Sequence, residues 1–324
     1  MNNFAPVLIP TLNRHVHFKK CIESLSKCIG ADKTDLFIAL DYPLNETHWE
    51  GYKIIKEYLP TITGFKSITI FERNHNFGAA KNLGAAAKII NENHDRKIIS
   101  EDDNVFGPSF LKFVNKGLDV YEEREDIFSV TGYNSPIIMP DWYMPDAYLR
   151  QNYCGWGVGT WLKKSLEVKT SMKALSEIFE RNISNIKNDY PQLIYGIKSM
   201  IKSGLLLGDL TVFLHMYDRG MYSVYPTKTR VKNIGTDGSG LHAPAVNKKY
   251  LYQKLDINVE GYDLPEDLEY NEELNKIIVK SYKRPAYEKV INLLREPMRR
   301  MGFNMNRVEL QNYLKQSFLK EKHV

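Results

Sequence analysis

The sequence has few cysteines and no long apolar run. Its 324 residues include three cysteines, Cys21, Cys28 and Cys154, which are too few for a disulfide framework. Their spacing fits no zinc ribbon, so we expect reduced thiols in a cytoplasmic protein. The N-terminal run MNNFAPVLIP lacks the basic and long apolar regions of a secretory signal peptide. No stretch approaches the roughly 20 apolar residues that a membrane-spanning helix needs.

The chain also lacks a strong net charge. Its 44 basic and 39 acidic residues leave a formal charge of +5, which by itself gives no reason to expect nucleic acid binding. Apolar residues make up 43% and charged residues 26%, the ordinary balance of a globular protein. The length allows one large α/β domain with an appendage, or two smaller domains.

Short apolar runs alternate with segments of helical spacing through residues 1–135. Strands are expected at residues 6–10, 35–40, 66–71, 97–99 and 128–133. Helices are expected at residues 17–28, 49–59, 78–90 and 110–121. Such alternation predicts a mainly parallel sheet with helices on both faces. Ligands bind beyond the carboxyl ends of the strands in these sheets, so residues just after each strand are candidates for a site.

The character of the sequence changes after residue 134. Residues 134–160 are rich in proline and aromatic residues, and we expect them to form loops. Helical spacing resumes at about residues 171–182 and 189–218. A glycine cluster, GTDGSG, follows at 235–240, and the chain becomes basic and helical from about residue 280. The C-terminal part is therefore expected to be a helical extension.

Three consecutive carboxylates, Glu101, Asp102 and Asp103, follow the fourth expected strand. Like charges held this close repel one another, so such a triplet is costly to keep together without a cation. Hard oxygen ligands favour Mg²⁺ or Mn²⁺, which can also bridge a diphosphate. The alternative is a solvated acidic turn that caps the next helix. The position at the carboxyl end of a strand favours the metal-binding interpretation.

Four segments in this order, VLIPTLNR, ALD, NFGAAKNLG and ISEDDNVFGPSFLKF, resemble the nucleotide-sugar half of GT-A glycosyltransferases. The pattern is most similar to the N-acetylglucosaminyltransferase I-like group, whose metal motif is also Glu-Asp-Asp. Two later segments, YCGWGVGTW and VKNIGTDGSGLH, resemble bacterial relatives used in surface-polysaccharide assembly. The resemblance implies a GT-A-like (Rossmann-like) α/β fold. Its nucleotide-sugar-binding half would be residues 1–134, its acceptor-binding half 135–250, and its helical extension 251–324.

The resemblance also implies roles for the acidic triplet and for a carboxylate after the second strand. Asp103 would bind Mn²⁺ or Mg²⁺ directly, while Glu101 and Asp102 would hold the base or ribose and the waters of the metal. Asp41 would accept the imide hydrogen of a uracil. An alternative for Asp41 is a turn residue before Pro43.

Further residues of the first half would surround the nucleotide. The resemblance implies that Thr11, Asn13 and Arg14 line the pocket, although Arg14 could be a plain surface arginine. Asn76 and Lys81 fall in a segment that packs under the nucleotide. Lys81 would neutralise diphosphate charge, or would be an ordinary exposed helix lysine.

Two segments of the second half carry further candidates. Trp156, in YCGWGVGTW, would form a wall for a sugar, because sugar C–H faces stack on aromatic rings; the alternative is a core anchor for the loop. His242 ends the glycine-rich loop GTDGSGLH and would complete the metal site, since neutral imidazole suits Mn²⁺.

Asp209 is the candidate catalytic base. It lies in the apolar run SGLLLGDLTVFLHM, where burial would raise its pKa. A position opening a helix after the Gly/Trp loop matches the order of the resembled group. Asp209 could instead be a helix N-cap, a common role of aspartate. Asp218 and Asp237 are weaker rivals.

Together these residues predict an inverting, metal-dependent hexosyl- or N-acetylhexosaminyltransferase. It would move a sugar from a nucleoside diphosphate, expected to be UDP, to a hydroxyl of a glycan or lipid-linked glycan in surface-polysaccharide biosynthesis. Basic and apolar residues interleave from Lys283 onward, which suggests peripheral contact with an anionic membrane or a packing helix with a solvated basic face. A sugar nucleotidyltransferase and a non-catalytic glycan-binding protein are the alternatives.

Overall fold

The computed structural model describes residues 4–235, 252–259 and 262–282. The described residues up to Asn275 belong to one compact unit, and a second unit begins at Lys276. None of the helices in these ranges is long and apolar enough to cross a membrane. The three cysteines are all free thiols, as expected.

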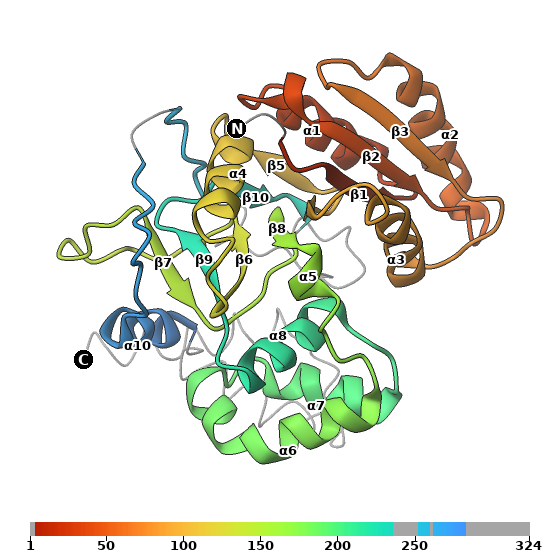
Figure 1. The fold of residues 1–324 in the computed structure, drawn as a ribbon. Coiled ribbons are helices and arrows are strands. Elements are labelled where there is room, and N and C mark those ends of the chain that lie inside the picture. The colour runs from red at the N-terminus through yellow and green to blue at the C-terminus, as the bar shows by residue number, and fades with distance from the viewer. Residues whose placement is uncertain (1–3, 236–251, 260–261, 283–324) are drawn as a thin grey trace, which may run out of the picture. The chain divides into compact units, whose positions relative to one another are not determined.

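The first unit is built on an eight-stranded sheet with the order β3-β2-β1-β4-β8-β6-β9-β7 (Figure 1). Its strands are β1 (Val7–Thr11), β2 (Asp35–Leu40), β3 (Ser67–Glu72), β4 (Arg96–Ile99), β6 (Ile127–Thr131), β7 (Ala147–Arg150), β8 (Val158–Trp161) and β9 (Tyr222–Pro226). Pairing is parallel along β3-β2-β1-β4 and between β6 and β9, whereas β8 is antiparallel to both β4 and β6. All strands except β7 and β8 therefore point the same way, which confirms the predicted mainly parallel α/β sheet.

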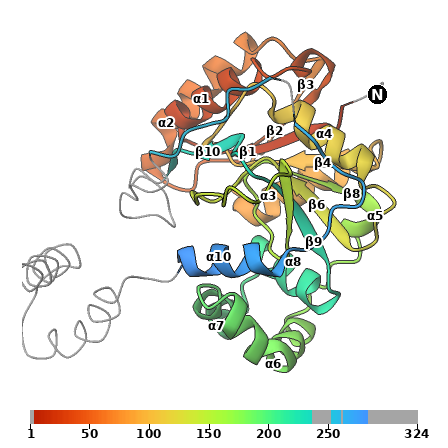
Figure 2. The same cartoon turned by 90° about the vertical axis from the view of Figure 1, so that its left-hand side faces the viewer.

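Helices cover both faces of the parallel half of the sheet. The helices here are α1 (His15–Leu25), α2 (Trp49–Tyr58) and α3 (Ala79–Ile90), whereas α4 (Phe110–Val120) and the short α5 (Leu162–Ser165) contact β8. On α3, Ala86 and Ile90 pack against Leu8 and Ala39 of the sheet. Figure 2 shows α1 and α2 on the other side of these strands. The apolar positions of α1 recur at helical spacing, which is why one face of that helix is buried and the other is solvated.

A group of three helices, α6 (Met172–Asp189), α7 (Ile194–Ser203) and α8 (Gly208–Asp218), follows β8 in the chain. These helices share their own apolar cluster, which includes Ile178, Ile197 and Phe213. The sequence predicted continuous helical spacing over 189–218, but α7 ends at Gly204, whose φ of 69° is left-handed. The helix α10 (Glu272–Tyr282) is the last described element.

The predicted loop region at 134–160 is wrong in part, because it contains β7 and the start of β8. Both strands are short and fully buried, so they lack the alternation of apolar and polar residues that marks a half-buried strand. The predicted division into nucleotide, acceptor and C-terminal parts stays a prediction. The basic segment from residue 283 onward lies outside the described residues.

Candidate active site

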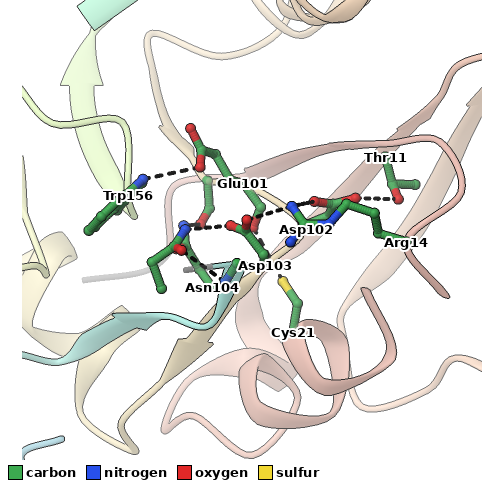
Figure 3. A network of polar contacts seen from close by, with 11 residues as sticks. Thr11, Arg14, Cys21, Glu101, Asp102, Asp103, Asn104 and Trp156 are labelled. Carbon is green, nitrogen blue, oxygen red and sulfur yellow. Dashed lines mark hydrogen bonds and ion pairs between the residues drawn. The ribbon is translucent and has the colours of Figure 1, made fainter. Parts of the chain in front are cut away.

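The acidic triplet lies at the carboxyl edge of the sheet, between β4 and the short strand β5 (Asn104–Phe106). β5 pairs with β10 (Val231–Asn233) in a separate two-stranded antiparallel sheet. This pairing brings a segment from late in the chain onto the triplet. Figure 3 shows the polar side chains that converge there.

Asp103 is buried and held on both carboxylate oxygens. Arg14 Nη1 donates to its Oδ2 at 2.6 Å, and Asn233 Nδ2 donates to its Oδ1 at 2.5 Å. The backbone N–H of Ile234 also donates to the carbonyl of Asp103 at 2.8 Å. The side chains of Arg14 and Asp103 are only 24% and 9% exposed, so this ion pair is shielded from solvent.

The other two carboxylates carry less compensated charge. Thr11 Oγ1 donates to Asp102 Oδ2 at 2.8 Å, and Arg14 Nη1 lies 3.8 Å from Asp102 Oδ1. Burial and the charge of Asp103 raise the pKa of Asp102 to about 6 despite these partners. Glu101 accepts a 3.1 Å hydrogen bond from Trp156 Nε1.

Glu101 keeps solvent access but has protein atoms packed around its carboxyl group. This dehydration, together with the negative charges of Asp103, Asp209 and Asp102, raises the pKa of Glu101 to about 8. Because the charge of Asp209 contributes to the pKa of Glu101, the candidate base lies close enough to the triplet to interact with it electrostatically. Excess negative charge of this kind is the environment in which a bound cation is most stabilising.

The segment 153–161 connects the candidate base to the triplet. The backbone N–H of Gly155 donates to Asp209 Oδ2 at 3.2 Å, while the next residue, Trp156, donates to Glu101. The ring of Trp156 also packs edge-on against Tyr133, with centroids 4.8 Å apart. Trp156 is half-buried and thus serves both as an anchor of its loop and as a surface beside Glu101.

Asp209 lies in the first turn of α8, but it is not the N-cap. The cap residue is Leu207, and no side chain caps this helix. The pKa of Asp209 is raised to about 6, chiefly by dehydration and against the hydrogen bond from Gly155. The neighbouring leucines do not bury it, because Leu205, Leu206 and Leu207 are all exposed. Dehydration by burial is still the leading cause of the shift, so its direction and its cause both agree with the prediction, although these three leucines are not the residues that supply it.

Asp41 is buried beneath the loop that begins α3. Its Oδ1 accepts hydrogen bonds from the backbone N–H groups of Tyr42 at 2.9 Å and Phe77 at 2.8 Å. Asn76 Nδ2 donates to the carbonyl of Tyr42 at 2.6 Å. Asp41 and Asn76 thus link the loop after β2 to the loop before α3. Asp41 is therefore more than a turn residue before Pro43.

The remaining candidates divide clearly. Asn13 contributes its backbone to the packing of α2, because a Cβ on Gly51 would meet Asn13 O at 1.9 Å. Lys81 is exposed on the first turn of α3, and in the described part of the chain it makes no contact with the triplet. His242 lies outside the described residues.

Sequence reasoning missed Asn233 as a site residue. Its Nδ2 contacts both Asp103 and Asn104 Oδ1, the latter at 3.2 Å, and its Oδ1 accepts from Gly235 N at 3.0 Å. A Cβ on Gly235 would lie 2.0 Å from Asp103 Oδ2 and 2.6 Å from Arg14 Nη2. The glycine lets the backbone cross directly over the ion pair. The segment VKNIG was the only signal available.

The carboxylate oxygens of the triplet are suitable ligands for a hard divalent cation. In this structure, however, those of Asp103 accept hydrogen bonds from protein side chains. Within the described ranges, no group of three His, Cys, Asp or Glu side chains is arranged to hold a metal ion. Both oxygens of Asp103 are occupied by Arg14 and Asn233. Each carboxylate oxygen can accept more than one interaction, but the Arg14 guanidinium would compete with a directly bound metal for Oδ2 of Asp103.

The backbone of the 153–161 segment depends on Gly157. Its φ is 68°, and an added Cβ would lie 2.8 Å from the Phe110 ring and 2.9 Å from Val231. Gly204 has the same φ region with nothing within 4 Å of an added Cβ. Both alanine variants incur the left-handed penalty, so Gly157→Ala should lose about 1–3 kcal/mol more unfolding free energy than Gly204→Ala. Urea denaturation measures both; equal losses would contradict the packing described here.

No family model matches the chain, and no curated protein matches its sequence. Similar solved structures include mannosyltransferase PcManGT from Pyrobaculum calidifontis in complex with GDP-Man and Mn²⁺, at 13% identity and a TM-score of 0.34, over 56% of this chain and 47% of that one. Another is S. aureus TarS 1-349, at 11% identity and a TM-score of 0.42, over 72% and 61%. TarS 1-349 in complex with UDP-GlcNAc aligns at 16% identity and a TM-score of 0.29, over 40% and 33%. Thus the chain spans less than two thirds of each neighbour, and overlap this limited identifies neither its family nor its activity.

Proposed function

We propose that this chain is a glycosyltransferase that moves a sugar from a nucleoside diphosphate to a hydroxyl of a glycan or lipid-linked glycan. The proposed nucleoside diphosphate is UDP. One observation carries the proposal. Gly155 and Trp156 are consecutive residues of one loop. Gly155 donates a hydrogen bond to Asp209, and Trp156 donates one to Glu101 of the acidic triplet. A base for an acceptor and a phosphate-binding edge for a donor are what such a transfer needs side by side.

The roles of the residues follow from their chemistry. Asp209 would take the proton of the acceptor hydroxyl as the new bond to the anomeric carbon forms. The bond from that carbon to the diphosphate oxygen would break on the opposite face, which inverts the configuration. Asp41 would read the base, and Trp156 would lie against the sugar.

A divalent metal, Mn²⁺ or Mg²⁺, would be held by Asp103 with help from Glu101 and Asp102. When bound, it would stabilise the negative charge on the departing diphosphate. Arg14 would leave Asp103 at that point, and its guanidinium would be free to pair with phosphate oxygens. Asn233 would keep Asp103 oriented through this exchange.

The test is a panel of UDP-, GDP- and CDP-sugars with and without Mn²⁺, read by thermal stabilisation and by release of the nucleoside diphosphate. We expect one donor class to raise the melting temperature in a metal-dependent way and to turn over slowly in water. Pyrophosphate release from a nucleoside triphosphate would support a nucleotidyltransferase instead. Stabilisation by free glycans without any donor turnover would support a binding protein.

A further inference from the structure

The connection between α7 and α8 exposes three consecutive leucines. Leu205, Leu206 and Leu207 are 69%, 42% and 40% exposed. They follow the left-handed Gly204, which ends α7 and turns the chain outward. A single exposed leucine is ordinary on a protein surface, but a run of three is the kind of apolar patch that marks an interaction site.

The outer face of α7 continues this patch with basic and aromatic residues. Tyr195, Lys198 and Lys202 recur at helical spacing, and all three are exposed. Tyr195 is 85% exposed. Residues 190–208 contain two lysines and no aspartate or glutamate. The outer face of α7 therefore carries two positive charges, and the exposed leucines follow directly after it.

The patch is not left over from an incomplete core. The opposite face of α7 carries Ile197 and Met200, which are buried in the cluster shared with α6 and α8. Leu210, Phe213 and Leu214 of α8 pack in the same cluster. The side chains of residues 205–207 are therefore not part of the apolar cluster of the three helices, and their exposure needs another explanation.

We propose that these residues form a membrane-docking surface for an anionic bilayer. This α7–α8 surface consists of Tyr195, Lys198, Lys202, Leu205, Leu206 and Leu207. Lysines near an anionic leaflet are attracted to its headgroups, while leucines and tyrosine enter the boundary between headgroups and acyl chains. None of these six residues is acidic, so the surface they form adds no repulsion of its own toward an anionic leaflet.

Docking would place Asp209 at the lipid surface. Asp209 comes two residues after Leu207, and its carboxylate is fixed by Gly155 of the candidate active site. A hydroxyl carried on a lipid would then be presented at the level of the base. This consequence rests on the proposed function, whereas the binding of the surface to vesicles does not.

The test is co-sedimentation of the full chain with phosphatidylcholine vesicles containing phosphatidylglycerol, without any donor. The triple variant Leu205→Ser, Leu206→Ser and Leu207→Ser should bind at least about tenfold more weakly. Serine at 207 is also a good helix N-cap, so α8 should be retained. Lys198→Gln with Lys202→Gln should lose about fivefold per lysine at low salt, and less at high salt.

The matched control is the pair Leu44→Ser and Leu166→Ser, which removes two leucines that are 70% and 72% exposed elsewhere. It should bind vesicles like the unchanged chain. Equal binding by the triple variant would overturn the proposal, and would point to another segment, such as the basic residues after 283. Loss of self-association in the triple variant, without vesicle binding by the unchanged chain, would overturn it in favour of a protein contact. Failure of every donor in the transferase assay leaves the vesicle result unaffected.

Discussion

Replacing Asp209 with asparagine should lower turnover by at least about 100-fold, the lower end of what general-base catalysis contributes. Asparagine keeps the shape of the side chain and can still accept the hydrogen bond from Gly155, but it cannot take a proton. Donor affinity should therefore be unchanged, since the proposed role of Asp209 is toward the acceptor. Steady-state kinetics and donor calorimetry measure the two quantities separately.

Two further readouts strengthen this test. Because the pKa of Asp209 is raised to about 6, kcat/KM of the unchanged protein should fall as the pH drops below that value and the base becomes protonated. The variant should lose the part of this acid limb that is due to Asp209, while protonation of Asp102, whose pKa is also about 6, still contributes. Asp218→Asn, at the other end of α8, removes a carboxylate that is paired with Arg181 and should leave turnover intact. Near-normal transfer by Asp209→Asn would remove Asp209 from the mechanism.

Asp103→Asn should reduce Mn²⁺-dependent affinity for UDP by more than about 100-fold, the upper end of the loss caused by removing an outer partner of a metal site. A neutral amide is a poor metal ligand, but it retains one oxygen for the contacts from Asn233 or Arg14. The fold should therefore survive, as circular dichroism and thermal unfolding would establish. Calorimetry that finds the same metal-dependent affinity in both proteins would refute the assignment.

The variant Arg14→Gln distinguishes the proposed role of Asp103 as a metal ligand from the role of Arg14, which is paired with it. Arg14 donates to Asp103, and under the proposed function it would compete with the metal for that carboxylate, so its removal should strengthen Mn²⁺ binding in the absence of nucleotide. The same change should weaken UDP binding, because the guanidinium is no longer available to the diphosphate. Parallel losses of both affinities would mean that Arg14 does not compete with the metal.

Local patterns in the sequence identified the parallel half of the fold well. The run DLFIAL predicted β2 at the residues it occupies, and the predicted helix at 78–90 differs from α3 by one residue at its start. These elements have strong periodicity or a continuous apolar run, and glycines or polar residues mark their ends. The triplet was found for the same reason, since it directly follows a recognisable strand.

The remainder depends on contacts that no local pattern encodes. Asn233 reaches Asp103 only because β10 pairs with β5, from 130 residues further along the chain. The direction of β8 cannot be read from VGTW, because a strand of four buried residues has the same composition either way round. The leucines at 205–207 gave the sequence around Asp209 an apolar character. In the structure these leucines are exposed, because other residues of α6, α7 and α8 form the apolar cluster.

The place of β8 in the sheet has a consequence for how the chain folds as it is made. β4 bonds only β1 and β8 in the sheet, and β6 only β8 and β9. Until residues 158–161 leave the ribosome, β4 presents an unpaired edge and β6 has no neighbour, because β9 comes later still. Unpaired edges recruit other chains, so fragments that stop short of β8 should aggregate or occupy chaperones. A four-residue strand thus sets the moment during synthesis at which β4 and β6 can be joined in one sheet.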